Sequence, residues 1–392
     1  MNIIFYCQHV LGVGHFFRTL EICRALAPHR VRLISGGPPL DAPLPAHVTE
    51  VRLPALRMDA QFKALLAEPG SDAQAVLHER RDRMQALFAA EPADLFVVEL
   101  YPFGRKAFRL EIDPLLAAVA DGRLPACGVV CSVRDILVEK ADPAAYEERV
   151  VATLNRYFDA VLVHADPALV RLEETFGRTA DIAVPLVYTG FITPRPAADA
   201  RRRKRAELGL WPGERLVVAS AGGGSVGMPL LEAVVAAFAR PEVPREARLM
   251  VCTGPFLAEP DFERLRTLAG DRTRVERFSS DFLALLAAAD LSVSMAGYNT
   301  TMNLLAARVP ALVWPFGQNR EQRMRSERLA ARGALRVLAD ADLEPSRLAA
   351  LIRERAADPR PAGGVVALDG AAAVADWVAR WRPERARHRR PA

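Results

Sequence analysis

The chain has little cysteine and very little lysine for its 392 residues. Its five cysteines form no Cys-x-x-Cys pair and have no histidine at metal-ligand spacing, which argues against a structural zinc site. We therefore predict buried free thiols in a reducing compartment, and no bound metal. Only four of the 52 basic residues are lysine, and the arginines are interspersed with acidic residues, so the formal net charge of +5 does not indicate a nucleic-acid partner.

Long hydrophobic segments are also lacking. No uninterrupted apolar run approaches the roughly 18 residues that a membrane-spanning helix needs. The first residues lack the basic leader of a secretory signal. The sequence therefore predicts a cytoplasmic protein.

What the chain does contain is the composition of a globular protein, with 51% hydrophobic and 25% charged residues. Its length predicts two domains. Short β-type runs alternate with amphipathic helical patterns, which predicts an α/β fold with parallel sheets. In the first helical pattern, Leu20, Cys23 and Leu26 form the apolar stripe and Arg18 lies on another face. The predicted strands are 3–7, 31–35, 95–99, 128–132 and 160–163, followed by 216–220, 249–253, 275–278, 291–294 and 311–314.

A domain boundary is predicted near residue 193. Two prolines in 193–196 precede five consecutive basic residues in 201–205, a composition typical of a linker. We interpret the basic run as a solvated linker and helix start, with contact to anionic lipid as the alternative. The predicted domains are 1–192 and 206–360, with the linker at 193–205 and a cleft between the domains as the ligand site.

The first glycine motif, residues 12–18, follows the first predicted strand. A dinucleotide fingerprint needs a third glycine at position 17, where this chain has Phe17. The turn instead presents His15 at the start of a helix, where a neutral imidazole can act as a general base. A histidine that is only hydrogen-bonded within the turn is the alternative.

The second motif, Gly222, Gly224 and Gly227, fits Gly-x-Gly-x-x-Gly between a strand and a helix. Binding of NAD also needs an acidic residue at the end of the next strand, and residues 249–254 contain none. The loop is therefore interpreted as a phosphate site, with a purely structural glycine turn as the alternative.

The third motif spans 294–301 and precedes a helix. Gly297 allows close approach of a ligand to the backbone, and Asn299 or Thr300 is the predicted N-cap. The N–H groups at such a helix start suit a diphosphate. A polar loop, 317–323, follows the next strand and carries side chains that can bind hydroxyl groups.

The order of these motifs resembles the GT-B glycosyltransferases, in particular the family 28 group that contains the peptidoglycan lipid-linked N-acetylglucosaminyltransferase. The resemblance is strongest over 216–335, and within it 278–282 resembles the base-contacting stretch. Residues 99–105 resemble a signature of bacterial predicted glycosyltransferases. The resemblance implies two Rossmann-like domains facing a central cleft, with the final helix, about 368–381, packing back on the N-terminal domain.

The same resemblance implies an enzyme, a hexosyltransferase that transfers a sugar from a nucleotide-sugar, with a UDP-sugar as first choice, to an acceptor hydroxyl. Direct displacement would invert the anomeric centre without a metal or another cofactor. His15 would be the catalytic base. The donor would contact Gly223, Gly224, Ser225, Phe278, Ser279, Gly297, Asn299, Thr300, Thr301, Asn303, Gln318 and Gln322. The acceptor side would include Gly14, Arg18, Glu99, Arg105, Arg134 and Asp135.

One departure from the family leaves the identity of the nucleotide base undetermined. Asn303 stands where the family usually has a glutamate that accepts from the ribose hydroxyls. A nucleotide-sugar hydrolase of the same fold and a non-catalytic nucleotide-sugar-binding protein are therefore kept as alternatives. The acceptor is left open between a lipid-linked and a small molecule. The basic C-terminal residues 380–390 are interpreted as a solvated tail, with peripheral membrane contact as the alternative.

Overall fold

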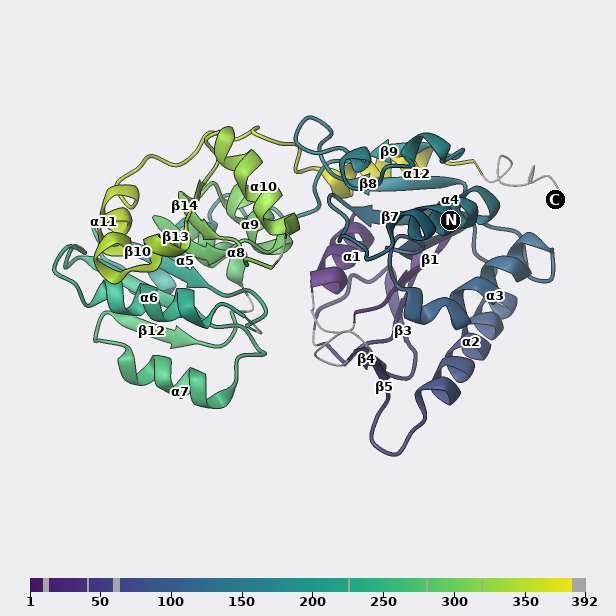
Figure 1. Cartoon of the computed structure of the whole chain (residues 1–392), viewed down its shortest axis with the longest axis horizontal. Helices are drawn as coiled ribbons and strands as arrows, with labels where there is room; N and C mark the ends of the chain where they lie inside the picture. Colours follow the sequence, from purple (N-terminus) through teal and green to yellow (C-terminus); the bar gives the residue numbers. More distant parts are fainter. Residues whose placement is uncertain are drawn as a thin grey trace. The chain divides into compact units, whose positions relative to one another are not determined.

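The computed structural model describes residues 1–9, 14–40, 42–58, 64–224, 226–279, 281–318 and 320–382. The chain divides into two compact units, each built on one parallel sheet. Unit 1 comprises Met1–Ile192 and the segment from Val366 onward, and unit 2 comprises Thr193–Val365. Figure 1 shows the C-terminal helix α12, in yellow, among the purple and blue elements of unit 1.

Unit 1 has a seven-stranded sheet in the order β3-β2-β1-β6-β7-β8-β9, in which all neighbours are parallel. The strands are β1 (Asn2–Cys7), β2 (Arg30–Ser35), β3 (Val48–Arg52), β6 (Leu95–Glu99), β7 (Gly128–Arg134), β8 (Ala160–His164) and β9 (Leu186–Tyr188). The helices are α1 (Gly14–Ala25), α2 (Ala73–Ala90), α3 (Arg109–Ala120), α4 (Pro143–Tyr157) and α12 (Gly370–Arg380). A separate antiparallel pair joins β4 (Arg57–Met58) and β5 (Leu65–Leu66).

The C-terminal helix α12 is part of the unit 1 core. Val374 and Val378 are buried in the same apolar cluster as Leu20 of α1. The indole of Trp381 lies so close to Gly128 that a Cβ on this glycine would come within 2.5 Å of the ring. The C-terminal segment therefore completes the hydrophobic core of the unit that contains the N-terminus.

Unit 2 has a six-stranded sheet in the order β12-β11-β10-β13-β14-β15, again parallel throughout. The strands are β10 (Arg215–Ser220), β11 (Ala247–Cys252), β12 (Thr273–Glu276), β13 (Leu291–Met295), β14 (Ala311–Trp314) and β15 (Arg336–Val337). The helices are α5 (Ala200–Glu207), α6 (Met228–Phe238), α7 (Glu259–Leu268), α8 (Phe282–Ala288), α9 (Tyr298–Ala307), α10 (Arg320–Ala331) and α11 (Pro345–Arg355).

The predicted α/β fold with parallel sheets is confirmed. Helices cover both faces of each sheet, so the central strands are buried on both sides and consist of nearly continuous apolar runs. All five cysteines are free and buried, as predicted. Burial raises the pKa of Cys7 and of Cys252 to about 12, so both thiols stay protonated at neutral pH. In the part of the chain that the structure describes, no helix has the length and apolar character needed to cross a membrane.

Candidate functional site

Each sheet reverses its strand order at one point. In unit 1, β1 lies between β2 and β6, and in unit 2, β10 lies between β11 and β13. Chains leaving the two strands at such a point turn to opposite faces of the sheet and leave a crevice at the carboxyl ends of the strands, where α/β proteins bind ligands. The predicted glycine motifs follow β1, β10 and β13, so all three lie at these switch points.

In unit 1 the switch point brings a histidine and a carboxylate together. His15 lies in the first turn of α1, and Glu99 is the last residue of β6. The distance from His15 Nδ1 to Glu99 Oε1 is 2.6 Å. Because a carboxylate can only accept, Nδ1 carries the proton and Nε2 is the basic nitrogen of the ring.

Two arginines hold the same carboxylate. Arg18 donates to Glu99 Oε1, and Arg105 Nη2 donates to Oε2 at 2.9 Å. Glu99 is fully buried, and the side chains of Arg18 and Arg105 are only 3% and 8% exposed. The helical pattern placed Arg18 on a polar face away from the apolar stripe. The structure buries this side chain because Glu99, which is distant in sequence, supplies its partner.

The charges of this cluster determine the protonation state of the histidine. Burial alone would raise the pKa of Glu99, but His15 and then Arg105 hold it well below its usual range, so Glu99 is ionised. Burial lowers the pKa of His15 to about 4; Glu99 opposes this shift and Arg105 adds to it. The His15 side chain is still 23% exposed. It is therefore a neutral and accessible base at pH 7.

The remaining acceptor-side residues lie near the ends of β1 and β7. Gly14 begins α1, and Arg134, the last residue of β7, donates from Nε to the carbonyl of Ile136 at 3.1 Å. Asp135 follows directly and is fully buried. Its burial leaves no exposed carboxylate at this position for an acceptor.

A buried histidine at the end of β8 was not predicted. His164 Nε2 lies 2.7 Å from Ser132 Oγ, and its Nδ1 lies 2.9 Å from Thr189 Oγ1. Burial, and next the nearby Arg18, lowers the pKa of His164 to about 3. The side chain is therefore a neutral link between β7, β8 and the segment after β9. The signal in the sequence that could have identified His164 is that it is a single polar residue at the end of an apolar strand.

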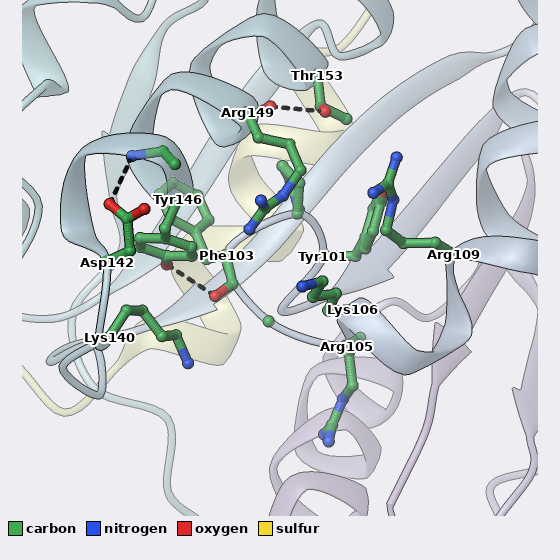
Figure 2. A pocket seen from close by; sticks show the side chains of 13 residues that line it. Tyr101, Phe103, Arg105, Lys106, Arg109, Lys140, Asp142, Tyr146, Arg149 and Thr153 are labelled. Atoms are coloured by element: carbon green, nitrogen blue, oxygen red, sulfur yellow. Dashed lines mark hydrogen bonds between the residues drawn. The ribbon is translucent and has the colours of Figure 1, made fainter. Parts of the chain in front are cut away.

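The segment after Glu99 is held in an unusual backbone conformation. Leu100 and Arg105 have φ values of 64° and 60°, in the left-handed region that costs a non-glycine residue about 1–2 kcal/mol. Between them, Gly104 packs so closely that a Cβ would come within 2.8 Å of the Leu100 side chain. This turn directs Arg105 back toward Glu99 and forms one wall of a cavity of about 440 Å³ (Figure 2). Residues 140–153 form the facing wall.

In unit 2 the glycine loop after β10 needs its glycines for its own structure. Gly222, Gly224 and Gly227 have φ values of 67°, 88° and 106°. A Cβ on Gly224 would come within 2.6 Å of the Thr253 carbonyl in the loop after β11. A Cβ on Gly222 would lie 3.6 Å from Thr300 Oγ1. The loop is therefore packed against the segment after β11 and lies next to the first turn of α9. This packing supports the structural interpretation of the glycines, and the phosphate site stays a prediction.

The other two predicted loop residues are Gly223 and Ser225. The carbonyl of Gly223 accepts from the amide of Phe256 at 3.0 Å, and Ser225 lies outside the described residues. A cavity of about 360 Å³ opens on this side of the loop, and its aromatic lining includes Phe256, Trp314 and Phe316. The predicted positions 278–303 do not line this cavity.

Helix α9 begins at Tyr298, so the predicted N-cap at Asn299 or Thr300 is wrong. The N-cap is Gly297, and no side chain caps the helix. The helix starts early because the amide of Thr301 already bonds to the carbonyl of Gly297 at 2.9 Å, directly after the turn that ends β13. Asn299 and Thr300 therefore lie in the first turn.

The surroundings of this turn differ on its two sides. A Cβ on Gly297 would meet no atom within 4 Å, so the space beside its backbone is open. Thr301 is fully buried, and its hydroxyl has no hydrogen-bond partner among the described residues. The Thr301 side chain therefore faces the interior, and Gly297 is the position where a ligand has room.

Three further predicted donor residues have distinct environments. Asn303 is half-buried, and its Oδ1 accepts from Thr193 Oγ1 at 3.0 Å. Gln322 Oε1 accepts from the amide of Phe316 at 3.1 Å and closes the loop between β14 and α10. Gln318 lies exposed in the same loop.

The predicted base-contacting stretch lies in a loop. Strand β12 ends at Glu276, two residues earlier than predicted. The Arg277 carbonyl still accepts from the amide of Gly254 at 2.8 Å, and its guanidinium lies 4.1 Å from the ring centroid of Phe262. Phe278 is 56% exposed, and Ser279 is half-buried. An exposed aromatic ring at the end of a sheet strand is available for stacking on a planar ligand.

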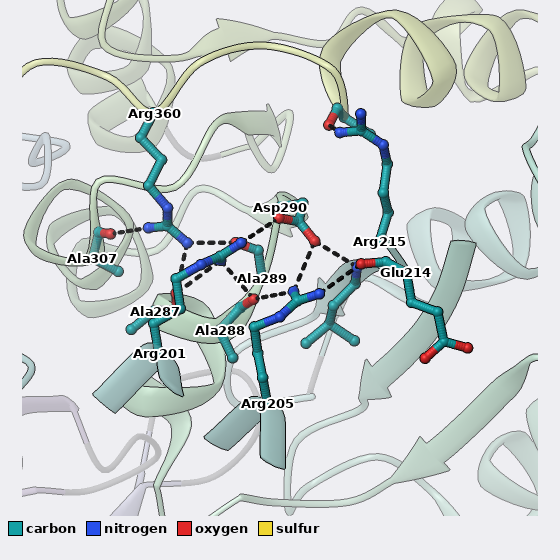
Figure 3. Close-up of polar contacts among 12 residues, drawn as sticks. Arg201, Arg205, Glu214, Arg215, Ala287, Ala288, Ala289, Asp290, Ala307 and Arg360 are labelled. Atoms are coloured by element: carbon teal, nitrogen blue, oxygen red, sulfur yellow. Dashed lines mark hydrogen bonds and ion pairs between the residues drawn. The ribbon is translucent and has the colours of Figure 1, made fainter. Parts of the chain in front are cut away.

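The basic run 201–205 lies in helix α5, which begins at Ala200, so the expected helix start is confirmed, but two of its arginines are bound by protein groups instead of being solvated. Arg201 and Arg205 both bind Asp290, at 2.6 and 3.0 Å. Both arginines also donate to carbonyl oxygens at the C-terminal end of α8. Arg360 donates to two carbonyl oxygens at the same helix end, those of Ala287 and Ala289 (Figure 3). Those carbonyls have no partner within α8, and the helix dipole makes this end negative, so the arginines are held in place there.

Residues 218–362 match the Glycosyltransferase family 28 C-terminal domain. The match lies within unit 2, which therefore resembles the C-terminal domain of this family. The matched range includes every residue predicted to contact the donor, from Gly223 to Gln322. The family resemblance inferred from the motifs is confirmed for this unit.

Two curated relatives carry the description UDP-N-acetylglucosamine--N-acetylmuramyl-(pentapeptide) pyrophosphoryl-undecaprenol N-acetylglucosamine transferase. The protein of Nitrosococcus oceani is 39% identical over 92 residues, which cover 23% of this chain and 26% of the relative. That of Clavibacter michiganensis subsp. michiganensis is 31% identical over 191 residues, 46% of this chain and 49% of the relative. The matches thus span half or less of the length of either relative.

Solved structures extend the similarity of fold to both units. The crystal structure of Acinetobacter baumannii MurG superposes with a TM-score of 0.58 at 17% identity, covering 97% of this chain and 98% of that one. The CalG4 calicheamicin glycosyltransferase gives a TM-score of 0.56 at 16% identity, with 98% and 96% covered. The predicted GT-B type of fold is confirmed. Unit 2 resembles the family 28 C-terminal domain, and His15 lies in the other Rossmann-like unit.

Proposed function

We propose that the protein is a glycosyltransferase that transfers a sugar from a nucleotide-sugar to an acceptor hydroxyl. The observation that carries the proposal is the His15–Glu99 pair at the switch point of unit 1, in a chain whose unit 2 resembles the family 28 C-terminal domain. The curated relatives are described as UDP-N-acetylglucosamine-dependent transferases. A UDP-sugar is accordingly the donor to test first.

In the proposed reaction, unit 1 supplies the base. His15 Nε2 takes the proton of the acceptor hydroxyl while the acceptor oxygen attacks the anomeric carbon. The bond from that carbon to the donor diphosphate breaks, and displacement from the opposite face inverts the centre. Glu99 fixes the tautomer through Nδ1 and stabilises the imidazolium as it forms, in the manner of the acid in a catalytic triad.

Unit 2 supplies the groups that receive the leaving diphosphate. Helix α9 starts at an open backbone position, Gly297, and has no side-chain cap. The N–H groups and the positive dipole end of such a helix stabilise developing negative charge on the diphosphate. The proposed reaction therefore needs no metal ion and no cofactor besides the donor.

The base and ribose are assigned to the segment from β12 to α9. Phe278 is exposed for stacking on the base, and Asn303 stands at the position where the family has a ribose-binding glutamate. An amide accepts a weaker hydrogen bond from a hydroxyl than a carboxylate does. We therefore expect UDP to bind, but with modest affinity.

The donor can be identified by thermal unfolding of the full-length protein with UDP, GDP, dTDP, CDP and ADP. A nucleotide that binds the native state at about 100 times its Kd adds about 2.7 kcal/mol and raises Tm measurably. We expect the largest shift with UDP. The absence of a shift with all five nucleotides contradicts the proposal.

Transfer and hydrolysis are separated by incubating the protein with the matching nucleotide-sugar alone and with lipid and small-molecule fractions of a cell extract. Acceptor-dependent loss of donor is expected. Rapid release of free sugar without any acceptor identifies a nucleotide-sugar hydrolase instead, and donor binding without turnover identifies a binding protein. The relatives' description names an undecaprenol-linked acceptor, so the lipid fraction also tests peripheral action at a membrane.

A further inference from the structure

The cavity of about 440 Å³ in unit 1 is strongly basic. Five cations line it, three that follow β6 and two that follow β7, namely Arg105, Lys106, Arg109, Lys140 and Arg149. The one acidic lining residue among those described is Asp142, which caps α4 by accepting from the amide of Ala145 at 3.1 Å. Two of the four lysines in the whole chain lie here.

The cations of the cavity fall into two groups. Arg105 pairs with Glu99, and Arg109 Nε donates to Asp113 at 3.0 Å. The other three, Lys106, Lys140 and Arg149, form no ion pair with any residue that the structure describes. Figure 2 shows Lys106 and Arg149 extending into the space between the two walls, while the Arg105 guanidinium is turned away.

Two of the three unpaired cations, Lys140 and Arg149, lie on the same aromatic ring. Tyr146 donates to the carbonyl of Phe103 at 2.8 Å, which fixes its ring between the two walls. The ring centroid lies 5.6 Å from Lys140 Nζ and 5.9 Å from Arg149 Cζ. Burial, and then the charges of Arg134 and Arg149, lower the pKa of the Lys140 amine. Lys106 and Lys140 are exposed and Arg149 is half-buried, so these positive charges are accessible to an anionic ligand that enters the cavity.

We propose that this cavity binds a phosphate group, as a monoester or a diphosphate, that the acceptor carries. Three cations from separate elements around one space match a group with two negative charges, and lysine and arginine are the usual phosphate-binding side chains.

The position of the cavity connects it to the proposed reaction. Arg105 lines the cavity and also pairs with Glu99, which accepts from His15. Two side chains, Arg105 and Glu99, thus connect the phosphate site to the base. This assignment rests on the proposed function, because a bound phosphate would then anchor the acceptor beside His15.

The test measures binding of three probes to the full-length protein by isothermal titration calorimetry with saturating UDP present. The probes are inorganic pyrophosphate, glucose 1-phosphate and geranyl diphosphate. The variants are Lys140→Gln, Arg149→Gln and the double variant. Arg123→Gln is the matched control, since Arg123 lies in unit 1, is 62% exposed and is outside the cavity.

Each single variant is expected to weaken binding of at least one phosphate probe by roughly tenfold, and the double variant by more, while the control binds like the wild type. Binding of glucose 1-phosphate only indicates a soluble acceptor, binding of geranyl diphosphate only a lipid-linked one, and either result supports the site. Equal affinity of wild type and double variant for every probe overturns it.

Two further measurements, the Tm and the affinity for UDP of each variant, show whether a loss of phosphate binding comes from misfolding or from a damaged donor site. Removing a cation that forms no ion pair should leave Tm unchanged, so the variants are expected to fold. The affinity for UDP should be the same in all variants. The wild type could bind the phosphate probes through this cavity and yet bind no nucleotide. That result supports the phosphate site and contradicts the proposed function.

Discussion

His15 donates from Nδ1 to a carboxylate that two arginines also bind, and this arrangement fixes both the tautomer and the charge of the ring. Glu99 cannot move to a better partner, because it is fully buried and both of its oxygens are occupied. The exposed part of the imidazole is thus a base of defined orientation. Its weakness as a base, with a pKa of about 4, follows from burial beside two guanidinium groups.

The low pKa of His15 predicts an unusual pH profile. The histidine is neutral at any pH above about 4, so kcat/KM should fall on the acidic side with a midpoint near pH 4. Because the folded pKa lies below the unfolded value of 6.5, the unfolded chain takes up this proton first, and the contribution of His15 to stability is lost as the pH falls from 6.5 to 4. A kinetic midpoint near 6.5 contradicts the buried environment of the ring.

Asn303 gives a second test at this scale. Replacing it with glutamate, Asn303→Glu, restores the acid that the family uses for the ribose. A carboxylate accepts a stronger hydrogen bond than an amide, by about 1 kcal/mol, so the affinity for UDP should rise roughly fivefold in calorimetry. Asn303→Gln keeps the amide and serves as the control. Unchanged affinity of the glutamate variant removes residue 303 from the ribose site.

The sequence predicted the residues of the site better than their contacts. Residues 99–105 and His15 were both singled out, but their pairing across 84 positions depends on the adjacency of β1 and β6, which no local pattern contains. Arg18 was assigned to a polar face for the same reason. The basic cavity was missed because its two walls follow different strands.

At the scale of secondary-structure elements, prediction was accurate in the middle of each sheet and poor at its edges. The strands missed or shifted include β3 and β9 at the edges of one sheet and β15 and β12 at the edges of the other. The separate pair β4 and β5 was also missed, and β11, next to an edge, starts two residues earlier than predicted. Edge strands are short and face solvent, so they lack the apolar run that identifies a buried strand. The central strands, buried on both faces, have that run.

The junction of α5 and α8 is an element-scale feature whose stability can be tested. Asp290 accepts from Arg201 and Arg205 and from the amide of Leu216, and its side chain is only 17% exposed. Asp290→Asn leaves clustered arginines without their carboxylate, so we expect unit 2 to lose about 1–3 kcal/mol in urea unfolding.

The matched control for Asp290 is Asp199→Asn in the same unit. Asp199 pairs with the exposed Arg202 and Arg203 and is itself 45% exposed, so its loss should cost less than about 0.5 kcal/mol. Similar losses for the two variants would show that the arginine cluster around α8 contributes no more than ordinary surface ion pairs.

In the whole molecule, the proposed catalytic base and the proposed donor site lie in different units of the chain. The proposed base and the basic cavity lie in unit 1, and the family 28 match and the proposed donor residues lie in unit 2. Length and alternating pattern were enough to predict two α/β halves. The basic run 201–205 was assigned to a linker because local composition does not reveal that α8 and Asp290 bind it.

In the proposed function, His15 acts as the base for sugar transfer while unit 2 binds the donor. This assignment is tested most directly by comparing wild type and His15→Ala in acceptor-dependent transfer from the nucleotide-sugar, with the donor Kd measured for both. We expect kcat to fall by about 10²–10⁴-fold in His15→Ala while the donor Kd stays within threefold. Unchanged transfer by His15→Ala would contradict this assignment.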